Sequence, residues 1–232
     1  MPDYKFLNSA HINCIIVDGT VRISTLSYYR KLEKEQWIAD CLEGSVGVNI
    51  SNLSKNSNED LGFAPKGFPE IYGAGTGNGM VFIRDTEIRY YSQDTFIFSA
   101  SRGDLPSLTK TMCQDSKDPY DACVRIVNME LLAHRMFHRG VVVEMGNTKV
   151  NRLFSHFHCA PVVYDDLRRD PKTTRLPQPS PFLKHSTFAP QREIRIALQP
   201  RQAIPLQNLT IKIPHPEKAF VEEFRKHLPI MP

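Results

Sequence analysis

The chain has 232 residues, of which 41% are hydrophobic and 23% charged, and its formal net charge is +4. This composition is typical of a globular protein, and the length fits one domain with a substantial core. No apolar run is long enough to span a membrane, which excludes a transmembrane protein, and the mild basicity permits a nucleic-acid partner without requiring one.

The five cysteines are scattered along the chain without a CxxC pair, a pattern that favours reduced thiols. The N-terminus has no basic segment followed by an apolar one, so no signal peptide is expected. Together these features predict a cytoplasmic protein that does not bind membranes.

The first half of the chain mixes strand and helix patterns. Residues 20–24 place Val21 and Ile23 on one side and polar residues on the other, as a strand does. In chain order we predict a strand at 4–7, a helix at 9–17 capped by Ser9, a turn at Asp18–Gly19, a strand at 20–24, a helix at 26–37, strands at 46–53, 80–84, 87–91 and 95–101, and a helix at 106–113.

Residues 54–79 are rich in Asn, Ser, Gly and Pro and are predicted to form a flexible loop or insertion. The glycines that recur at every second position from Gly73 to Gly79 lack the spacing of a dinucleotide-binding fingerprint, and no helix pattern follows them.

The second half is richer in strands. We predict strands at 120–127, 141–145, 154–163, 191–198 and 204–213, helices at 129–139 and 217–227, and a charged, proline-rich loop at 165–181. Strands outnumber helices over the whole chain. The expected fold class is therefore α+β, with residues 1–232 forming one domain around a mostly antiparallel sheet with flanking helices.

The most informative of these strands contains Glu193. Its pattern places Ile194, Ile196 and Leu198 on one face, and it places Glu193 on the other face with Gln191 beside it. A carboxylate in this position, next to an amide, can stabilise a positive charge that develops on a sugar. The simpler interpretation is an exposed edge strand with ordinary polar residues.

A second candidate group comes from the front of the chain. Lys5, Ser24, Tyr28 and Tyr29 offer a donor, a hydroxyl and aromatic faces within one short stretch, and a nicotinamide ring needs such a stacking partner. Tyr28 and Tyr29 also fit half-buried helix positions. Ser99, with Ser101 near the end of the strand at 95–101, is placed to orient a catalytic carboxylate, although serine also commonly ends strands.

The candidate metal ligands do not form a convincing site. His156 and His158 share a strand face, but Cys159 points the other way and no matching pair stands nearby. Asp40 and Glu43 are paired carboxylates in a turn, which most simply fix the loop. No metal is expected.

The order of these pieces resembles the ADP-ribosyltransferase superfamily. Gln191-Arg192-Glu193 matches its late Gln/Glu-x-Glu motif, and Phe98-Ser99-Ala100-Ser101 is similar to its Ser-Thr-Ser element. The block from Lys184 through Phe188 and Gln191 to Arg195 also resembles a Lys-x-x-x-Phe-x-x-Gln-x-Glu-x-Arg motif of uncharacterised bacterial proteins. Lys5 stands where the superfamily has His or Arg, and Arg22 could take over that role.

This resemblance implies a split antiparallel sheet and NAD as the substrate, without a metal. It implies Glu193 and Gln191 as catalytic residues, and contacts to NAD from a set of six residues: Lys5, Arg22, Ser24, Tyr28, Tyr29 and Ser99. The implied role is a bacterial toxin or anti-phage effector, with an antitoxin as a further partner. The acceptor could be protein, DNA, RNA or water, and the basic stretch at 168–172 slightly favours nucleic acid.

Three alternatives stay open at this stage. With water as acceptor the chain would be an NAD glycohydrolase. The same scaffold could also be a non-enzymatic module that binds a nucleotide or a protein partner. A metal-dependent nuclease using Asp40 and Glu43 is the third alternative, and it would lose its activity with EDTA.

Overall fold

The computed structural model describes residues 1–32, 44–50, 53–54, 82–83, 86–113, 120–166, 168–169 and 179–225. Within them, ten strands join in one sheet, and every neighbouring pair of these strands is antiparallel. The strands are β1 (Asp3–Leu7), β2 (Thr20–Thr25), β7 (Phe96–Arg102), β8 (Ala122–Ile126), β9 (Val141–Val142), β10 (Thr148–Lys149), β11 (Phe154–Pro161), β15 (Glu193–Pro200), β16 (Asn208–Lys212) and β17 (Phe220–Arg225).

Strand β7 lies at the centre and divides one side of the sheet. On that side β2 pairs with Phe96 and Ile97, whereas β1 pairs with Ser101 and Arg102. The register leaves three residues of β7, numbers 98–100, between the two neighbours. On its other side β7 pairs along most of its length with β15, which in turn pairs with β11. The sheet is thus split at β7.

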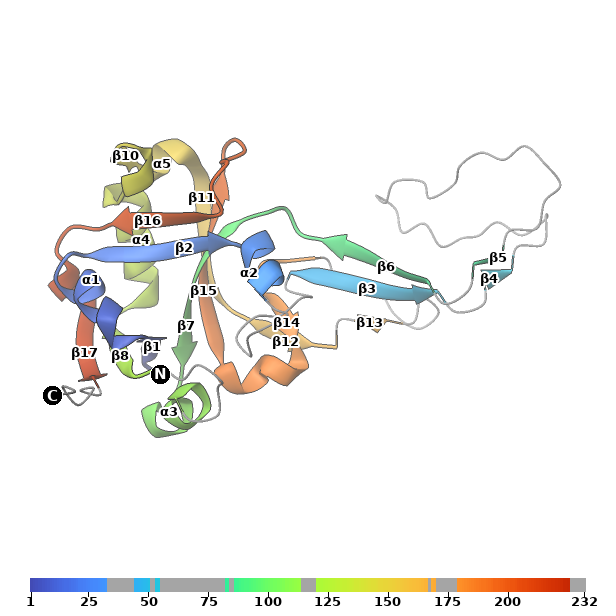
Figure 1. Ribbon diagram of the computed structural model, residues 1–232, viewed down its shortest axis with the longest axis horizontal. Coiled ribbons are helices and arrows are strands. Elements are labelled where there is room, and N and C mark those ends of the chain that lie inside the picture. The colour runs from blue at the N-terminus through green and yellow to red at the C-terminus, as the bar shows by residue number, and fades with distance from the viewer. Residues whose placement is uncertain are drawn as a thin grey trace, which may run out of the picture.

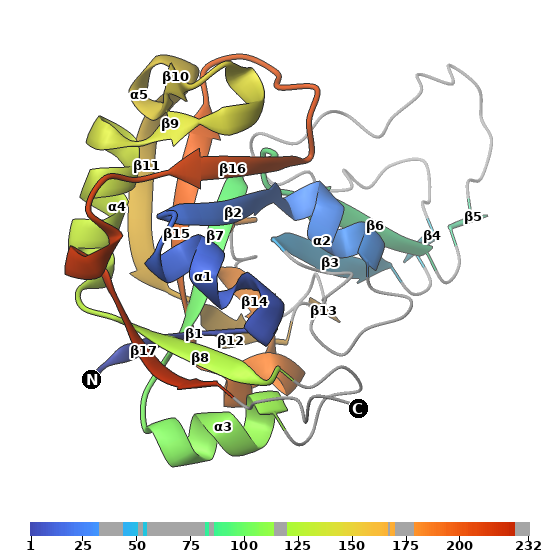
Figure 2. The ribbon, with the colours of Figure 1, turned by 60° about the vertical axis from the view of Figure 1, so that its left-hand side comes forward.

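The helices are short, and the longest of them covers one face of the sheet. They are α1 (Ile12–Ile16), α2 (Leu26–Leu32), α3 (Leu105–Cys113), α4 (Met129–Arg139) and α5 (Val150–Leu153), with 3-10 turns η1 (Ser9–His11), η2 (Val143–Met145), η3 (Ser186–Gln191) and η4 (Pro216–Lys218). Figure 2 shows α4 beside β11 and α1 between β2 and β17, in agreement with their contacts.

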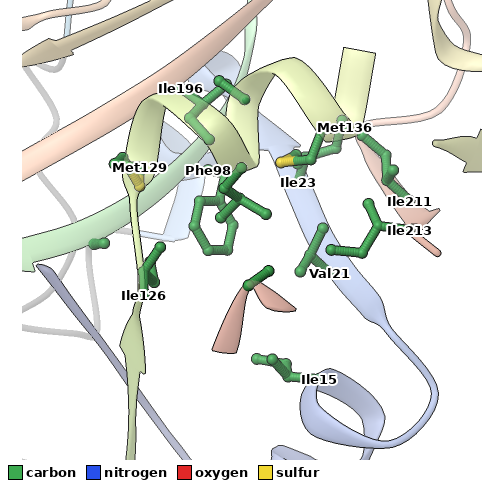
Figure 3. Close-up of a cluster of buried hydrophobic side chains, with 14 of the residues drawn as sticks. Ile15, Val21, Ile23, Phe98, Ile126, Met129, Met136, Ile196, Ile211 and Ile213 are labelled. Carbon is green, nitrogen blue, oxygen red and sulfur yellow. The ribbon is translucent and has the colours of Figure 1, made fainter. Parts of the chain in front are cut away.

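The main core lies between α4, α1 and one face of the sheet. Strand alternation sends Phe98 and Ile196 to this face, where they meet Met129 and Met136 of α4 (Figure 3). The opposite face carries a smaller apolar cluster of Leu26, Ile97 and Ala197, with Tyr29 and Phe182 packed against it. That second face holds the candidate site.

Smaller sheets extend from this body. They contain β3 (Ser45–Ile50), β4 (Leu53–Ser54), β5 (Phe82–Ile83), β6 (Thr86–Tyr91), β12 (Val163–Asp165), β13 (Arg168–Arg169) and β14 (Leu183–His185). The antiparallel β3–β6 pair leads away from the main sheet (Figure 1), while β12 runs parallel to β14 and β13 parallel to β3. The predicted α+β class with a mostly antiparallel sheet is confirmed.

The turn into β2 needs a glycine. Gly19 has φ +69°, and a Cβ placed there would lie 2.5 Å from the carbonyl oxygen of Ile213. Its own carbonyl accepts a hydrogen bond from Ile213 N at 2.8 Å. The predicted Asp18–Gly19 turn therefore joins the start of β2 to the end of β16.

Several local predictions were wrong. Of the helix expected at 217–227, the described residues form the end of η4 and the strand β17, because the exposed edge of β8 offers backbone partners that outweigh helix propensity. The helix cap is Asn8 instead of Ser9, since Asn8 Oδ1 accepts from Ala10 N at 2.9 Å. The strand expected at 141–145 turns into η2 after two residues. The loop at 54–79, apart from Ser54 in β4, lies outside the described residues.

Candidate active site

Glu193 lies in a small cleft of about 80 Å³ on the face of the sheet opposite to α4. The residues that give this cleft its chemistry come from five separate parts of the chain: Lys5, Tyr29, Ser99, Tyr120, and the group of Lys184, Glu193 and Arg195. We call it the Glu193 cleft. Four of the predicted site residues, Lys5, Tyr29, Ser99 and Glu193, line it.

The backbone places Glu193 at the start of an interior strand. Glu193 lies opposite Ser101 of β7, and its N–H donates to the hydroxyl of Tyr164 at 2.7 Å. Because β15 runs between β7 and β11, the interpretation as an exposed edge strand was wrong. The Glu193 side chain is only 10% exposed.

Two cations hold the carboxylate of Glu193. Lys184 Nζ donates to Oε1 at 3.0 Å, and Arg195 donates to Oε2 from Nε at 2.8 Å and from Nη2 at 2.6 Å. Burial alone would raise the pKa of Glu193, but the charges and hydrogen bonds of Arg195 and Lys184 lower it to about 2. The carboxylate is therefore ionised throughout the physiological pH range.

Gln191 reaches this site through Lys184. Its Oε1 accepts from Lys184 Nζ at 2.8 Å, and the same ammonium lies 4.7 Å from the centre of the Phe188 ring. Gln191 ends η3, outside β15, because Arg192 adopts a left-handed conformation with φ +46°. The predicted shared strand was thus wrong, yet one lysine connects both side chains.

Lys5 lies at the split of the sheet. Its Nζ donates to the backbone carbonyl of Ser99 at 2.8 Å and lies 5.0 Å from the centre of the Phe98 ring. Desolvation lowers the pKa of Lys5 to about 8, although the charge of Glu193 raises it. Ser99 takes part in this contact through its backbone carbonyl. The carboxylate of Glu193 is held by Lys184 and Arg195, whereas the hydroxyl of Ser99 was expected to orient it.

Tyrosines complete the cleft. Burial and the charge of Glu193 raise the pKa of Tyr120 to about 12, so its hydroxyl stays protonated and can donate a hydrogen bond. Tyr29 comes from α2 and packs against the apolar cluster of Leu26, Ile97 and Ala197. An aromatic face and a neutral donor therefore border the carboxylate.

The other three predicted NAD contacts do not line the cleft. Ser24 Oγ donates to Asn208 Oδ1 at 2.7 Å, across the β2–β16 pair. Arg22 Nη2 donates to the hydroxyl of Tyr28 at 3.2 Å on the exposed surface. Ser24, Arg22 and Tyr28 thus bond to neighbouring side chains and are not among the residues that line the Glu193 cleft.

Lys184, Arg195, Tyr120 and Tyr164 were not predicted as site residues. The signal for the first two was present, since both belong to the Lys-x-x-x-Phe-x-x-Gln-x-Glu-x-Arg block. Tyr120 and Tyr164 had no signal, because loops and strand pairing bring them to Glu193 from distant positions.

The described residues that line the cleft include three basic side chains, Lys5, Lys184 and Arg195, and one carboxylate, Glu193. Such a concentration of basic groups favours a ligand with negative charge. Within the described residues no group of three His, Cys, Asp or Glu side chains could hold a metal ion; Asp40 and Glu43 lie outside those residues.

No helix in the described part of the chain is long and apolar enough to cross a membrane. Comparisons with protein-family models, with curated proteins and with solved structures found no match. The geometry of the Glu193 cleft and the order of its motifs therefore carry the functional argument.

Proposed function

We propose that the chain is an NAD-dependent ADP-ribosyltransferase whose essential group is the carboxylate of Glu193. The observation that carries the proposal is a fixed, ionised and largely buried carboxylate that lines a cleft beside Lys5 and Tyr29. Glu193 and Ser99, which belong to the motifs that resemble the superfamily, line the same cleft as Lys5 and Tyr29.

The hydrogen bonds of Glu193 leave it with a free acceptor position. Oε2 accepts twice from Arg195, whereas Oε1 accepts once, from Lys184, among the described residues. A carboxylate oxygen can accept two hydrogen bonds, so Oε1 can also accept one from a ribose hydroxyl. Because Lys184 and Arg195 already fix the carboxylate, it needs no reorganisation when the reaction begins.

The proposed reaction breaks the bond between C1′ of the ribose and the nicotinamide nitrogen. The electron pair leaves with nicotinamide, positive charge develops on the sugar, and the carboxylate of Glu193 stabilises that charge. The acceptor then forms a bond to C1′ and releases a proton.

The size of the cleft limits what it can enclose. Small-molecule sites usually span about 300–1,000 Å³, and the Glu193 cleft measures about 80 Å³. Only one end of a dinucleotide would be enclosed there, with the remainder lying over the surface. The proposal therefore assigns the cleft to the nicotinamide end, next to Tyr29.

The test is nicotinamide release by the purified chain, with NAD alone and with added RNA, DNA or cell protein. An ADP-ribosyltransferase will release nicotinamide and label one of these macromolecules. Release with free ADP-ribose as product would identify an NAD glycohydrolase, and absence of release under every condition would contradict the proposal.

A second candidate is a non-enzymatic module that binds a nucleotide. The observation that favours it is the ion-pair network itself, because Lys184 and Arg195 already neutralise the charge of Glu193. Cations near the ribose also oppose the charge that develops in the reaction. This candidate predicts that NAD binds and is recovered intact.

A further inference from the structure

A second, larger hollow lies on the same face of β15 as the Glu193 cleft. Residues 193, 195, 197 and 199 alternate onto this face, and the hollow opens over the last two, Ala197 and Gln199. It measures about 410 Å³, within the range usual for small-molecule sites. We call it the histidine hollow.

Strand pairing builds its floor and one wall. In the register, His158 of β11 lies opposite Ala197, His156 lies opposite Gln199, and Ala197 lies opposite Ile97 of β7. The short side chain of Ala197 leaves space between its neighbours. His156 and His158 line the hollow with ring centres 5.0 Å apart, and Phe182 also lines it.

The described lining has aromatic rings and polar groups. Among the described residues that line the hollow there is no Lys, Arg, Asp or Glu, in contrast to the Glu193 cleft. The imidazoles of His156 and His158, which lie nearly perpendicular to each other, and the Phe182 ring supply aromatic surface, and Gln199 Oε1 accepts a hydrogen bond from the Thr95 hydroxyl at 3.2 Å. A flat, uncharged ligand with donors and acceptors on its edge matches this lining.

We propose that the histidine hollow binds a nucleobase. Bases stack on flat side chains, and a glutamine carboxamide can pair with the donor and acceptor edge of a base. Gln199 is six residues from Glu193, or roughly 20 Å along an extended strand. The hollow would therefore hold a base on the same face of β15 as Glu193 but away from the Glu193 carboxylate. The inference does not depend on the proposed function.

The base could belong to a free nucleotide, to NAD or to a nucleic acid. The test is calorimetric titration with AMP, GMP, CMP and UMP, with NAD, and with short RNA and DNA oligonucleotides. Ribose 5-phosphate, which has no base, is the control ligand. We expect at least one nucleotide to bind and ribose 5-phosphate not to bind. The relative affinities of the nucleotides, NAD and the oligonucleotides will identify the source of the base.

The matched variants are two pairs of histidines. The double substitution His156→Ala and His158→Ala removes the wall of the hollow, and we expect it to weaken binding at least about fivefold. The double substitution His134→Ala and His138→Ala is the control, because these rings stack on each other on α4, where His134 contacts Phe157. Binding should stay unchanged in this control.

Glu193→Gln separates the two proposals, because it should abolish nicotinamide release yet leave the hollow and its affinity unaltered. Three results would overturn the inference: equal nucleotide affinity of the two double histidine variants, binding of ribose 5-phosphate as tight as that of the nucleotides, or no binding of any probe. Gln199→Leu should also weaken binding while leaving the histidines in place.

Discussion

The carboxylate of Glu193 keeps its charge where an isolated anion would be strongly destabilised. The side chain is 10% exposed, and the two cations that bond to it, Lys184 and Arg195, are each 1% exposed. A buried charge of this kind depends on its partners, because the loss of one leaves the others without compensation.

Lys184→Met tests this dependence. The variant removes one of the two cations that bond to Glu193, and the free energy of unfolding should fall by roughly 3 kcal/mol, the lower end of what breaking a buried ion pair causes, since Arg195 remains. Urea denaturation measures the change. Lys212→Met on the exposed side of β16 is the control and should stay within about 0.5 kcal/mol of the parent.

Lys5 gives the fold a distinct dependence on pH. Its pKa falls from the ordinary lysine value of 10.5 to about 8 in the folded chain, so between these values the unfolded chain binds more protons at this site. Stability contributed by Lys5 should therefore rise with pH across that window.

The measurement compares the parent with Lys5→Met by urea denaturation at pH 8 and pH 10. The difference in free energy of unfolding, parent minus variant, should increase at the higher pH, because the unfavourable burial of the ammonium disappears. A difference that is constant with pH would show that Lys5 is as well solvated in the folded chain as in the unfolded one.

Secondary structure was predictable where a pattern was long. The helix at 129–139 has such a pattern, and the structure begins and ends it at the predicted residues. The strand at 20–24 was predictable from alternation, and the structure extends it by one residue; the apolar strand predicted at 95–101 is observed one residue further along at both ends, at Phe96–Arg102. The pattern of the helix predicted at 217–227 is weaker, and Phe220–Arg225 pair instead with the open edge of β8.

The cap of α4 is a local feature that can be tested alone. Asn128 Oδ1 accepts from Leu131 N at 2.8 Å, which satisfies a backbone donor in the first turn. Asn128→Ala should reduce the free energy of unfolding by about 1 kcal/mol, while Asn128→Asp should preserve it. Thermal denaturation of both variants checks this, and equal losses in the two would argue against the cap.

The candidate site was only partly visible in the sequence. Alternation along β15 placed Glu193 and Arg195 on one face, and the structure has both at the cleft. Tyr164 and Lys5 reach Glu193 through strand pairing between distant segments, which a local pattern does not report. The conformation of Arg192, which takes Gln191 out of the strand, also had no signal.

The two faces of the main sheet differ in what they carry. One packs Phe98 and Ile196 against α4, and the other carries the Glu193 cleft and the histidine hollow side by side along β15. The split at β7 gives Lys5 access to the carbonyl of Ser99. Both proposed sites thus lie on the face that α4 leaves open.

The most direct test of the central claim is nicotinamide release from NAD by the parent chain and by Glu193→Gln, with Glu217→Gln on the exposed surface as the matched control. The account predicts that Glu193→Gln, verified as folded by its circular dichroism, loses roughly 100- to 1,000-fold in rate while Glu217→Gln keeps the parent rate. Equal release by the parent and a folded Glu193→Gln variant would contradict it.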